Sequence, residues 1–159
     1  MIWDFSFGRL FGSLFICWAA GLASFLFAIP SLDSWYAQLI KPSVAPPQWL
    51  FLPLWLLLYT LMGVGLYFLW NEDTKRVEVK KALLLFIMQL LLSVLWSSSF
   101  FGLRSLWISA LVSVLLFLVL FQTILRLYKL PSVAAWLLIP QLLWSGYCVI
   151  FNWALVPIV

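Results

Sequence analysis

The sequence predicts an all-α integral membrane protein built as a five-transmembrane-helix bundle. Of its 159 residues, 66% are hydrophobic and only 9% are charged, whereas a soluble domain carries about 45–50% apolar and about 25% charged residues. The mean hydropathy of +1.13 also places most of the surface in lipid. A membrane β-barrel would need short segments that alternate between apolar and polar residues, and runs such as Leu83–Leu84–Leu85 show no such alternation.

Five stretches reach the length of about 20 apolar residues that a membrane helix needs. They cover, in order, residues 7–29, 49–70, 82–101, 106–127 and 133–153. The apolar run of the first stretch continues past the loosely signal-peptidase-like residues 21–23, so we expect this helix to stay uncleaved. Together they predict a single domain over residues 1–159, with no room for a second.

The connections differ in character. Residues 71–81 hold seven of the 14 charges and are expected to form a solvated loop, while the short link at 102–105 makes the third and fourth helices antiparallel neighbours. The longest connection, 30–48, contains Trp35 and Tyr36 side by side but few charges. Since disordered linkers are poor in aromatic residues, we expect 30–48 to be an ordered lid loop over one mouth of the bundle.

Lys and Arg in short loops indicate orientation, because they collect on the cytoplasmic side. On the N-terminal side of the predicted spans lie Arg9, Lys75, Arg76, Lys80, Lys81, Arg126 and Lys129. On the opposite side lie only Lys41 and Arg104. The N-terminus is therefore predicted to be cytoplasmic, with the first loop and the C-terminus outside.

Several functions lose support from composition alone. Histidine is absent, which removes His-ligated metals and His-based acid–base catalysis. The ionisable Asp, Glu, Lys and Arg residues lie at or beyond the helix ends, so a proton or ion pathway lacks its usual groups. A net charge of only +4 argues against nucleic-acid binding. Cys17 and Cys148 lie in no metal or redox motif, and we expect neither a metal nor a bound cofactor.

Neutral polar and aromatic residues fall on one face of three helices. These faces carry Trp55, Tyr59, Met62 and Gly63; Gln89, Ser93, Trp96 and Ser97; and Gln141, Trp144, Ser145, Cys148 and Asn152. Each face alone is explained equally well by hydrogen bonding between helices. The three faces together favour a shared aromatic cavity, which would suit a flat, largely apolar ligand. The Gly8-x-x-x-Gly12 pair is a weak signal for close helix packing or a homodimer face.

Three blocks of residues carry a family resemblance. The first is Trp35-Tyr36, Lys41-Pro42, Pro46-Pro47, Trp49, Phe51, Pro53, Trp55, Leu58-Tyr59 and Met62-Gly63; the second is Gln89-Leu90, Trp96-Ser97 and Phe100-Phe101-Gly102; the third is residues 135–140 with Leu143-Trp144 and Phe151-Asn152. In this order and spacing the sequence resembles the tryptophan-rich sensory protein family, also called translocator protein or peripheral-type benzodiazepine receptor.

The resemblance implies a five-helix bundle, often dimeric, with a pocket closed by the first loop. It implies porphyrins, notably protoporphyrin IX, or other flat lipophilic small molecules as ligands. Trp55 and Trp144 match the pocket tryptophans that the family ties to ligand binding and porphyrin breakdown. Other pocket or lid positions are matched by Trp35, Tyr36, Trp49, Phe51, Tyr59, Gln89 and Trp96.

Departures from the family pattern affect ligand preference. Ser93 stands where Asn is usual, Gln141 replaces a common Tyr, Ser98 replaces a common Pro, and Ser43 occupies a place often held by an aromatic. The basic residue of the animal sterol motif is missing after Phe151, so sterol binding through that weak motif is not expected.

Three functions follow as hypotheses. The first is a membrane tetrapyrrole-binding protein that acts as a sensor, regulator or carrier in porphyrin metabolism and stress response. The second is light-dependent porphyrin breakdown, in which Trp55 and Trp144 would support radical intermediates although the sequence shows no conventional catalytic group. The third is transport of porphyrins or small lipophilic ligands, which ranks lower because five helices cannot form two equal repeats.

Overall fold

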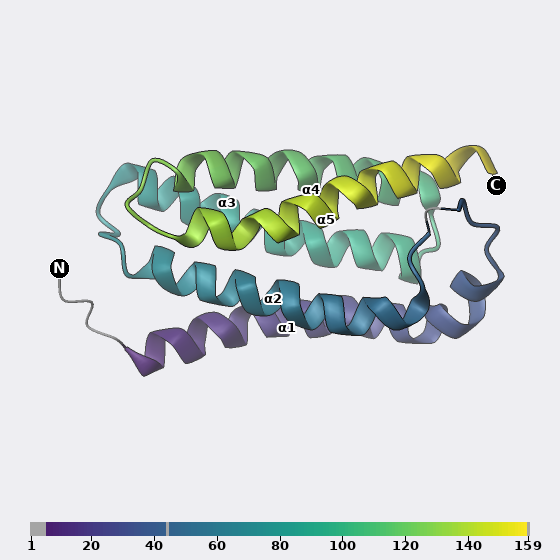
Figure 1. The fold of residues 1–159 in the computed structure, drawn as a ribbon, viewed down its shortest axis with the longest axis horizontal. Coiled ribbons are helices and arrows are strands. Elements are labelled where there is room, and N and C mark those ends of the chain that lie inside the picture. Colours follow the sequence, from purple (N-terminus) through teal and green to yellow (C-terminus); the bar gives the residue numbers. More distant parts are fainter. Residues whose placement is uncertain (1–5, 44, 159) are drawn as a thin grey trace.

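Five long helices make up the computed structural model, which describes residues 6–43 and 45–158. They are α1 (Phe7–Ser31), α2 (Gln48–Trp70), α3 (Val77–Ser97), α4 (Leu106–Leu127) and α5 (Ala134–Leu155). All five are long and apolar enough to cross a membrane. Successive helices run in opposite directions, so the α2–α3 and α4–α5 loops lie at the end where α1 begins (Figure 1). The predicted all-α fold class is confirmed.

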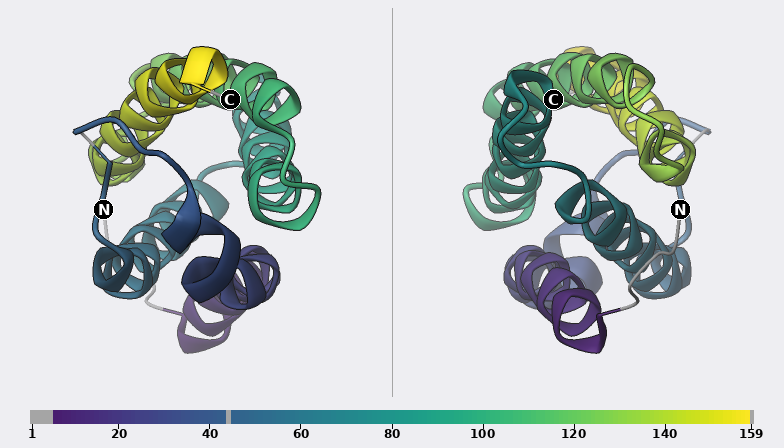
Figure 2. Two further views of the ribbon diagram at one scale, coloured as in Figure 1. Left: turned by 90° about the vertical axis from the view of Figure 1, so that its right-hand side faces the viewer. Right: turned by 90° about the vertical axis from the view of Figure 1, so that its left-hand side faces the viewer.

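The helices form a closed ring in the order α1, α2, α5, α4, α3. Figure 2 shows this ring end-on, with the segment after α1 crossing one end of the bundle. The short link makes α3 and α4 direct neighbours in the ring, as the sequence predicts. Consecutive α2 and α3, by contrast, are joined by a loop across the bundle, and their inner faces look onto the same interior.

The third helix begins earlier than predicted. It starts at Val77 rather than residue 82, so the charged loop covers only residues 71–76. The first turn carries Glu78, an acidic residue that suits a helix N-terminus. Its Oε2 lies 2.8 Å from Nη1 of Arg126 in the last turn of α4. Glu78, Lys80 and Lys81 therefore belong to an exposed helix end rather than to the predicted loop, which is a correction to the sequence prediction, while the other four charges stay in the loop.

The first connection is also more helical than predicted. α1 continues through Pro30 to Ser31 and passes into a π-helical segment, η1 (Leu32–Tyr36), so irregular backbone is confined to the part after residue 38. Ser34 Oγ donates to the carbonyl of Pro30 at 2.7 Å, and Trp35 packs edge-on against Phe100. The lid is thus a helical extension followed by a short loop, because its two aromatic residues are held by the bundle. Another π-helical segment, η2 (Ser98–Gly102), follows α3 at the same end.

Serine hydroxyls join α1 to α3 and to η2. Ser97 Oγ donates to the carbonyl of Ser24 at 2.6 Å, and Ser31 Oγ donates to the carbonyl of Phe101 at 2.7 Å. Ser24, Ser31 and Ser97 are all buried. Inside a bilayer such bonds satisfy polar atoms that water cannot reach.

Glycine residues of α2 allow this helix to approach its neighbours closely, and Gly63 does so toward α1. A Cβ added to Gly63 would lie 2.8 Å from Cδ2 and 3.0 Å from Cα of Leu14. Because one of these atoms is backbone, the helix itself would have to move. At Gly65 the nearest atom is the end of a flexible side chain, Leu138 Cδ1 at 2.8 Å, so that position can adjust more easily.

We expect Gly63→Ala to destabilise the protein by about 1–3 kcal/mol through overpacking against Leu14. Thermal unfolding in detergent checks this. The matched control is Gly8→Ala, since a Cβ at Gly8 would meet no atom within 4 Å. Equal melting temperatures for the two variants would show that the α1–α2 seam tolerates a methyl group.

Candidate ligand-binding site

Aromatic side chains gather beneath the lid end of the bundle. Phe51 lies at the centre, with its ring centroid 5.4 Å from that of Tyr36, 5.7 Å from Trp55 and 6.3 Å from Trp144. Edge-to-face and tilted arrangements dominate these contacts, as the ring quadrupoles favour. We call this the aromatic cluster; it comprises Trp35, Tyr36, Phe51, Trp55, Trp96, Phe100, Phe101, Trp144, Tyr147 and Phe151.

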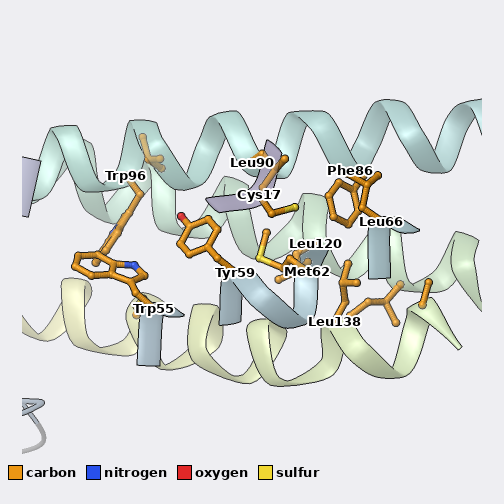
Figure 3. Packing of buried hydrophobic residues seen from close by; sticks show 14 of the residues in the cluster. Cys17, Trp55, Tyr59, Met62, Leu66, Phe86, Leu90, Trp96, Leu120 and Leu138 are labelled. Atoms are coloured by element: carbon orange, nitrogen blue, oxygen red, sulfur yellow. The ribbon is translucent and has the colours of Figure 1, made fainter. Parts of the chain in front are cut away.

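A small cavity lies inside the ring of helices next to the aromatic cluster. It is lined by Trp55, Tyr59, Ser93, Trp96, Leu116, Gln141, Trp144, Ser145 and Cys148, which come from α2, α3, α4 and α5. Figure 3 shows Trp55 and Tyr59 reaching from α2, and Trp96 from α3, into the same interior region. The volume of this inner cavity is about 20 Å³. Residues from each of the three polar-aromatic faces predicted from the sequence therefore line one space, but their side chains nearly fill it. Gly63 and Ser97 of the same faces contact α1 instead.

The predicted site residues fall into three groups. Most of them line the inner cavity: Trp55, Tyr59, Ser93, Trp96, Gln141, Trp144, Ser145 and Cys148. Trp35, Tyr36 and Phe51 instead belong to the aromatic cluster at the lid. The remaining two lie apart from the cavity lining: Gln89 is fully buried one turn before Ser93, and Trp49 is 73% exposed on the outside of α2.

Several buried polar atoms near the cavity have no hydrogen-bond partner among the described residues. These atoms are both side-chain polar atoms of Gln89, Nε1 of Trp96, Oε1 of Gln141 and Oδ1 of Asn152. A buried polar atom without a partner costs about 1–3 kcal/mol, and native proteins keep few of them. Two of these atoms, on Trp96 and Gln141, belong to residues that line the cavity. They are available to bind polar substituents of a ligand or water.

Ser93 is satisfied locally. Its Oγ donates to the Gln89 carbonyl at 2.8 Å, the bond that a serine commonly makes to the preceding helical turn. The Ser93 hydroxyl thus has a bond of its own, and its remaining capacity toward the cavity is that of an acceptor.

Hydrogen bonds close the lid over the aromatic cluster. Tyr36 Oη donates to the carbonyl of Pro46 at 2.9 Å, and Lys41 Nζ donates to the carbonyl of Tyr36 at 2.6 Å while lying 4.5 Å from its ring centroid. Gln48 Nε2 donates to the carbonyl of Leu32 at 2.6 Å and so joins the start of α2 to the end of α1. Tyr36 is fully buried and connects the lid to the rings below it.

Sequence reasoning missed several members of this site. Phe100 and Phe101 stand at the centre of the ring contacts, and their appearance as an aromatic pair just before Gly102 was the available signal. Leu116 lines the cavity but lies in an unbroken apolar run of α4 that gives no sign of a site. Phe25, from α1, packs edge-on against Trp55 at 5.5 Å.

The fold and site together define a class of protein: a five-helix membrane protein with an aromatic interior site beneath a lid. The chain belongs to the TspO/MBR family, whose pattern it matches over residues 13–157.

Named relatives agree with this assignment. The chain is 35% identical to the tryptophan-rich protein TspO of Chlorobaculum tepidum over 90% of each chain. It is 36% identical to the protein of that name from Archaeoglobus fulgidus, over 92% of this chain and 94% of the relative. It is 38% identical to the human translocator protein, over 75% of this chain and 71% of the relative. The family resemblance found in the three sequence blocks is confirmed.

We expect Tyr36→Phe to loosen the lid, because the Pro46 carbonyl loses its donor at a net cost of about 1 kcal/mol. Hydrogen exchange of the amides of Leu39 and Ala45, which bond within the lid, should accelerate. Tyr128→Phe is the control, since Tyr128 is 49% exposed at the far end of α4. Unchanged exchange in Tyr36→Phe would show that the hydroxyl does not hold the lid.

Proposed function

We propose that this protein binds a flat, largely apolar ring molecule of the porphyrin class in the inner cavity and acts as a sensor, regulator or carrier in porphyrin metabolism and stress response. The observation that supports this most is the meeting of indole rings and partnerless polar atoms at one interior cavity lined by four helices. Ligand pockets commonly combine apolar and aromatic walls with a few polar groups that fix orientation. Membership in the TspO/MBR family favours the same ligand class.

The volume of the cavity sets a condition on binding. Ligand pockets usually measure about 300–1,000 Å³, far more than the roughly 20 Å³ of this cavity. Binding therefore requires side chains to separate. Trp144 and Tyr147 are only partly buried and stack on each other with centroids 5.1 Å apart, so they can move at a lower cost than the fully buried Phe100 and Phe101.

Each lining group has a role in the proposed complex. Trp55 and Trp144 offer ring faces for stacking, as flat ligands require. Trp96 Nε1 offers a donor and Gln141 Oε1 offers an acceptor. The Ser145 hydroxyl already donates to the Leu142 carbonyl at 3.0 Å, so it offers an acceptor only. Because the buried donor and acceptor lack other partners, their bonds to a ligand would replace no existing protein bond.

The proposed membrane orientation follows the distribution of charge. The seven basic residues of the predicted cytoplasmic side gather at the end of the bundle where α1 begins, and the lid lies at the other end (Figure 1). We place the lid on the outside on this basis. Membrane lipid surrounds the helices, and a homodimer through the Gly8–Gly12 face is compatible with the open space at Gly8.

Replacing Trp55 and Trp144 together by Phe should weaken binding of protoporphyrin IX about tenfold, or about 1.4 kcal/mol, since two indole contacts are reduced. Titration followed by porphyrin absorbance checks this. The matched control is Trp107→Phe with Trp153→Phe, because these tryptophans pair with each other at the surface and are 62% and 43% exposed. Equal affinity in the two double variants would reject the inner cavity as the binding site.

Light-dependent porphyrin breakdown is a second candidate, favoured by the two indoles that border the same cavity. The excited ligand and molecular oxygen would supply the chemistry, and the tryptophans would stabilise radicals beside the ring. Under illumination the bound porphyrin should lose its absorbance faster than free porphyrin in detergent. The Trp55→Phe, Trp144→Phe variant, saturated with porphyrin, should lose this acceleration; decay at the rate of free porphyrin in the native protein would exclude the activity.

A further inference from the structure

A large groove lies on the lipid-facing flank of the bundle between α1 and α2. Its volume is about 610 Å³, within the range of ligand pockets. α1 lines it with side chains from Phe15 to Phe25, and α2 with side chains from Leu52 to Tyr59. Two tryptophans line it, Trp18 and Trp55. The Trp18 indole is already used, because its Nε1 donates to Thr60 Oγ1 at 3.1 Å.

The groove and the inner cavity share a wall. Trp55 and Tyr59 line both of them, and both side chains are buried. A molecule in the groove would therefore face the outer surfaces of the side chains whose inner surfaces border the cavity. Displacing these two side chains would join the two spaces.

Contacts between α1 and α2 bound this wall at both ends. On the cytoplasmic side of the predicted orientation, the helices meet at Gly63 and Leu14 and through the bond from Trp18 to Thr60. On the lid side, the bond from Gln48 to the Leu32 carbonyl joins them again. Between these two sets of contacts lies a window of limited height between α1 and α2. The side chains that fill the window can move aside while the helices stay joined above and below it.

The wall meets α1 through a hydrogen bond, a ring contact and close packing against a glycine. Ser24 Oγ and Tyr59 Oη share a hydrogen bond of 3.1 Å, and Phe25 meets the Trp55 ring edge-on at 5.5 Å. Opposite the Tyr59 ring stands Gly21, where even a Cβ would lie 2.9 Å from the ring. Because Gly21 has no side chain, the Tyr59 ring packs directly against the α1 backbone at this position, and no α1 side chain there blocks its path.

We propose that the flat apolar ligand enters the inner cavity sideways from the bilayer through this window, with Trp55 and Tyr59 as its gate. The proposal rests on the proposed function of the inner cavity. An apolar molecule concentrates in lipid rather than in water, and the lid end is closed by hydrogen bonds and by the fully buried Tyr36. The wall shared with the cavity identifies the occupant of the groove as this ligand in transit.

Cys148 allows a test that needs no porphyrin. It lines the inner cavity, and Cys17 is the other cysteine of the chain. In a Cys17→Ala background, reconstituted in liposomes, the rate at which N-(1-pyrenyl)maleimide adds to the Cys148 thiol measures access of a flat apolar molecule to the cavity. Mass spectrometry confirms the labelled residue, and thermal unfolding confirms that each variant is folded.

Two double variants separate the groove from the rest of the lipid-facing surface. Leu22→Trp with Leu56→Trp fills the groove, since both residues line it and both are 58% exposed. Leu26→Trp with Leu57→Trp is the matched control, since these residues are 59% and 54% exposed and lie outside the groove lining. Ser24→Ala removes the hydrogen bond between Ser24 and Tyr59.

We expect the groove-filling variant to slow labelling about tenfold, the control to leave it unchanged, and Ser24→Ala to speed it about fivefold. Equal rates in the two double variants would overturn the proposal and mean that the groove holds lipid acyl chains only. Absence of labelling in the Cys17→Ala protein would overturn it as well. Failure of the proposed porphyrin binding is a separate result, because it appears in the titration and leaves the labelling rates unaffected.

Discussion

Polar atoms that lie in hydrocarbon must be satisfied by the protein itself, and this constraint organises the bundle around α1. Two serine bonds fix α1 to the end of α3 and to η2, while Gly63 brings its other flank against α2. Because α1 is held on both sides, the rings carried by η1 and η2 are held over the interior, and the aromatic cluster forms between them. The lid, the cavity and the groove all depend on this placement of one helix.

The interior combines two features that oppose each other energetically. Stacked and edge-on rings pack the space below the lid, which favours a closed state, whereas partnerless atoms on Gln89, Gln141 and Trp96 cost free energy as long as they stay unbound. Binding of a ligand that separates the rings removes the ring contacts. Hydrogen bonds from the ligand to the partnerless atoms would then offset part of that cost. The site is therefore built so that ligand polarity, and not only shape, influences whether it opens.

Much of this could be predicted from the sequence, because apolar length and the spacing of Trp55, Trp96 and Trp144 are local properties. The bounds of α3 could not, since its charged first turn is stabilised by Arg126, which lies far along the chain. The helical extension after Ser31 depends likewise on Phe100, a distant contact. Trp49 lies near the pocket residues in sequence, but its position on α2 leaves its side chain exposed and outside the cavity lining. The pattern of residues predicts neither the size of the cavity nor the wall that separates it from the groove beside α1.

Both π-helical segments occur at the lid end, and each contains rings of the aromatic cluster. A π turn holds one residue more than an α turn, and each residue rotates an α-helix by about 100°. The side chains that follow such a turn are therefore rotated about the helix axis by about that angle, compared with an unbroken α-helix. The number of residues per turn thus decides which side chains of residues 32–36 and 98–102 point into the bundle. Deleting one residue here would rotate the segment, so that rings lining the interior exchange places with side chains facing lipid. The length of the membrane span would hardly change.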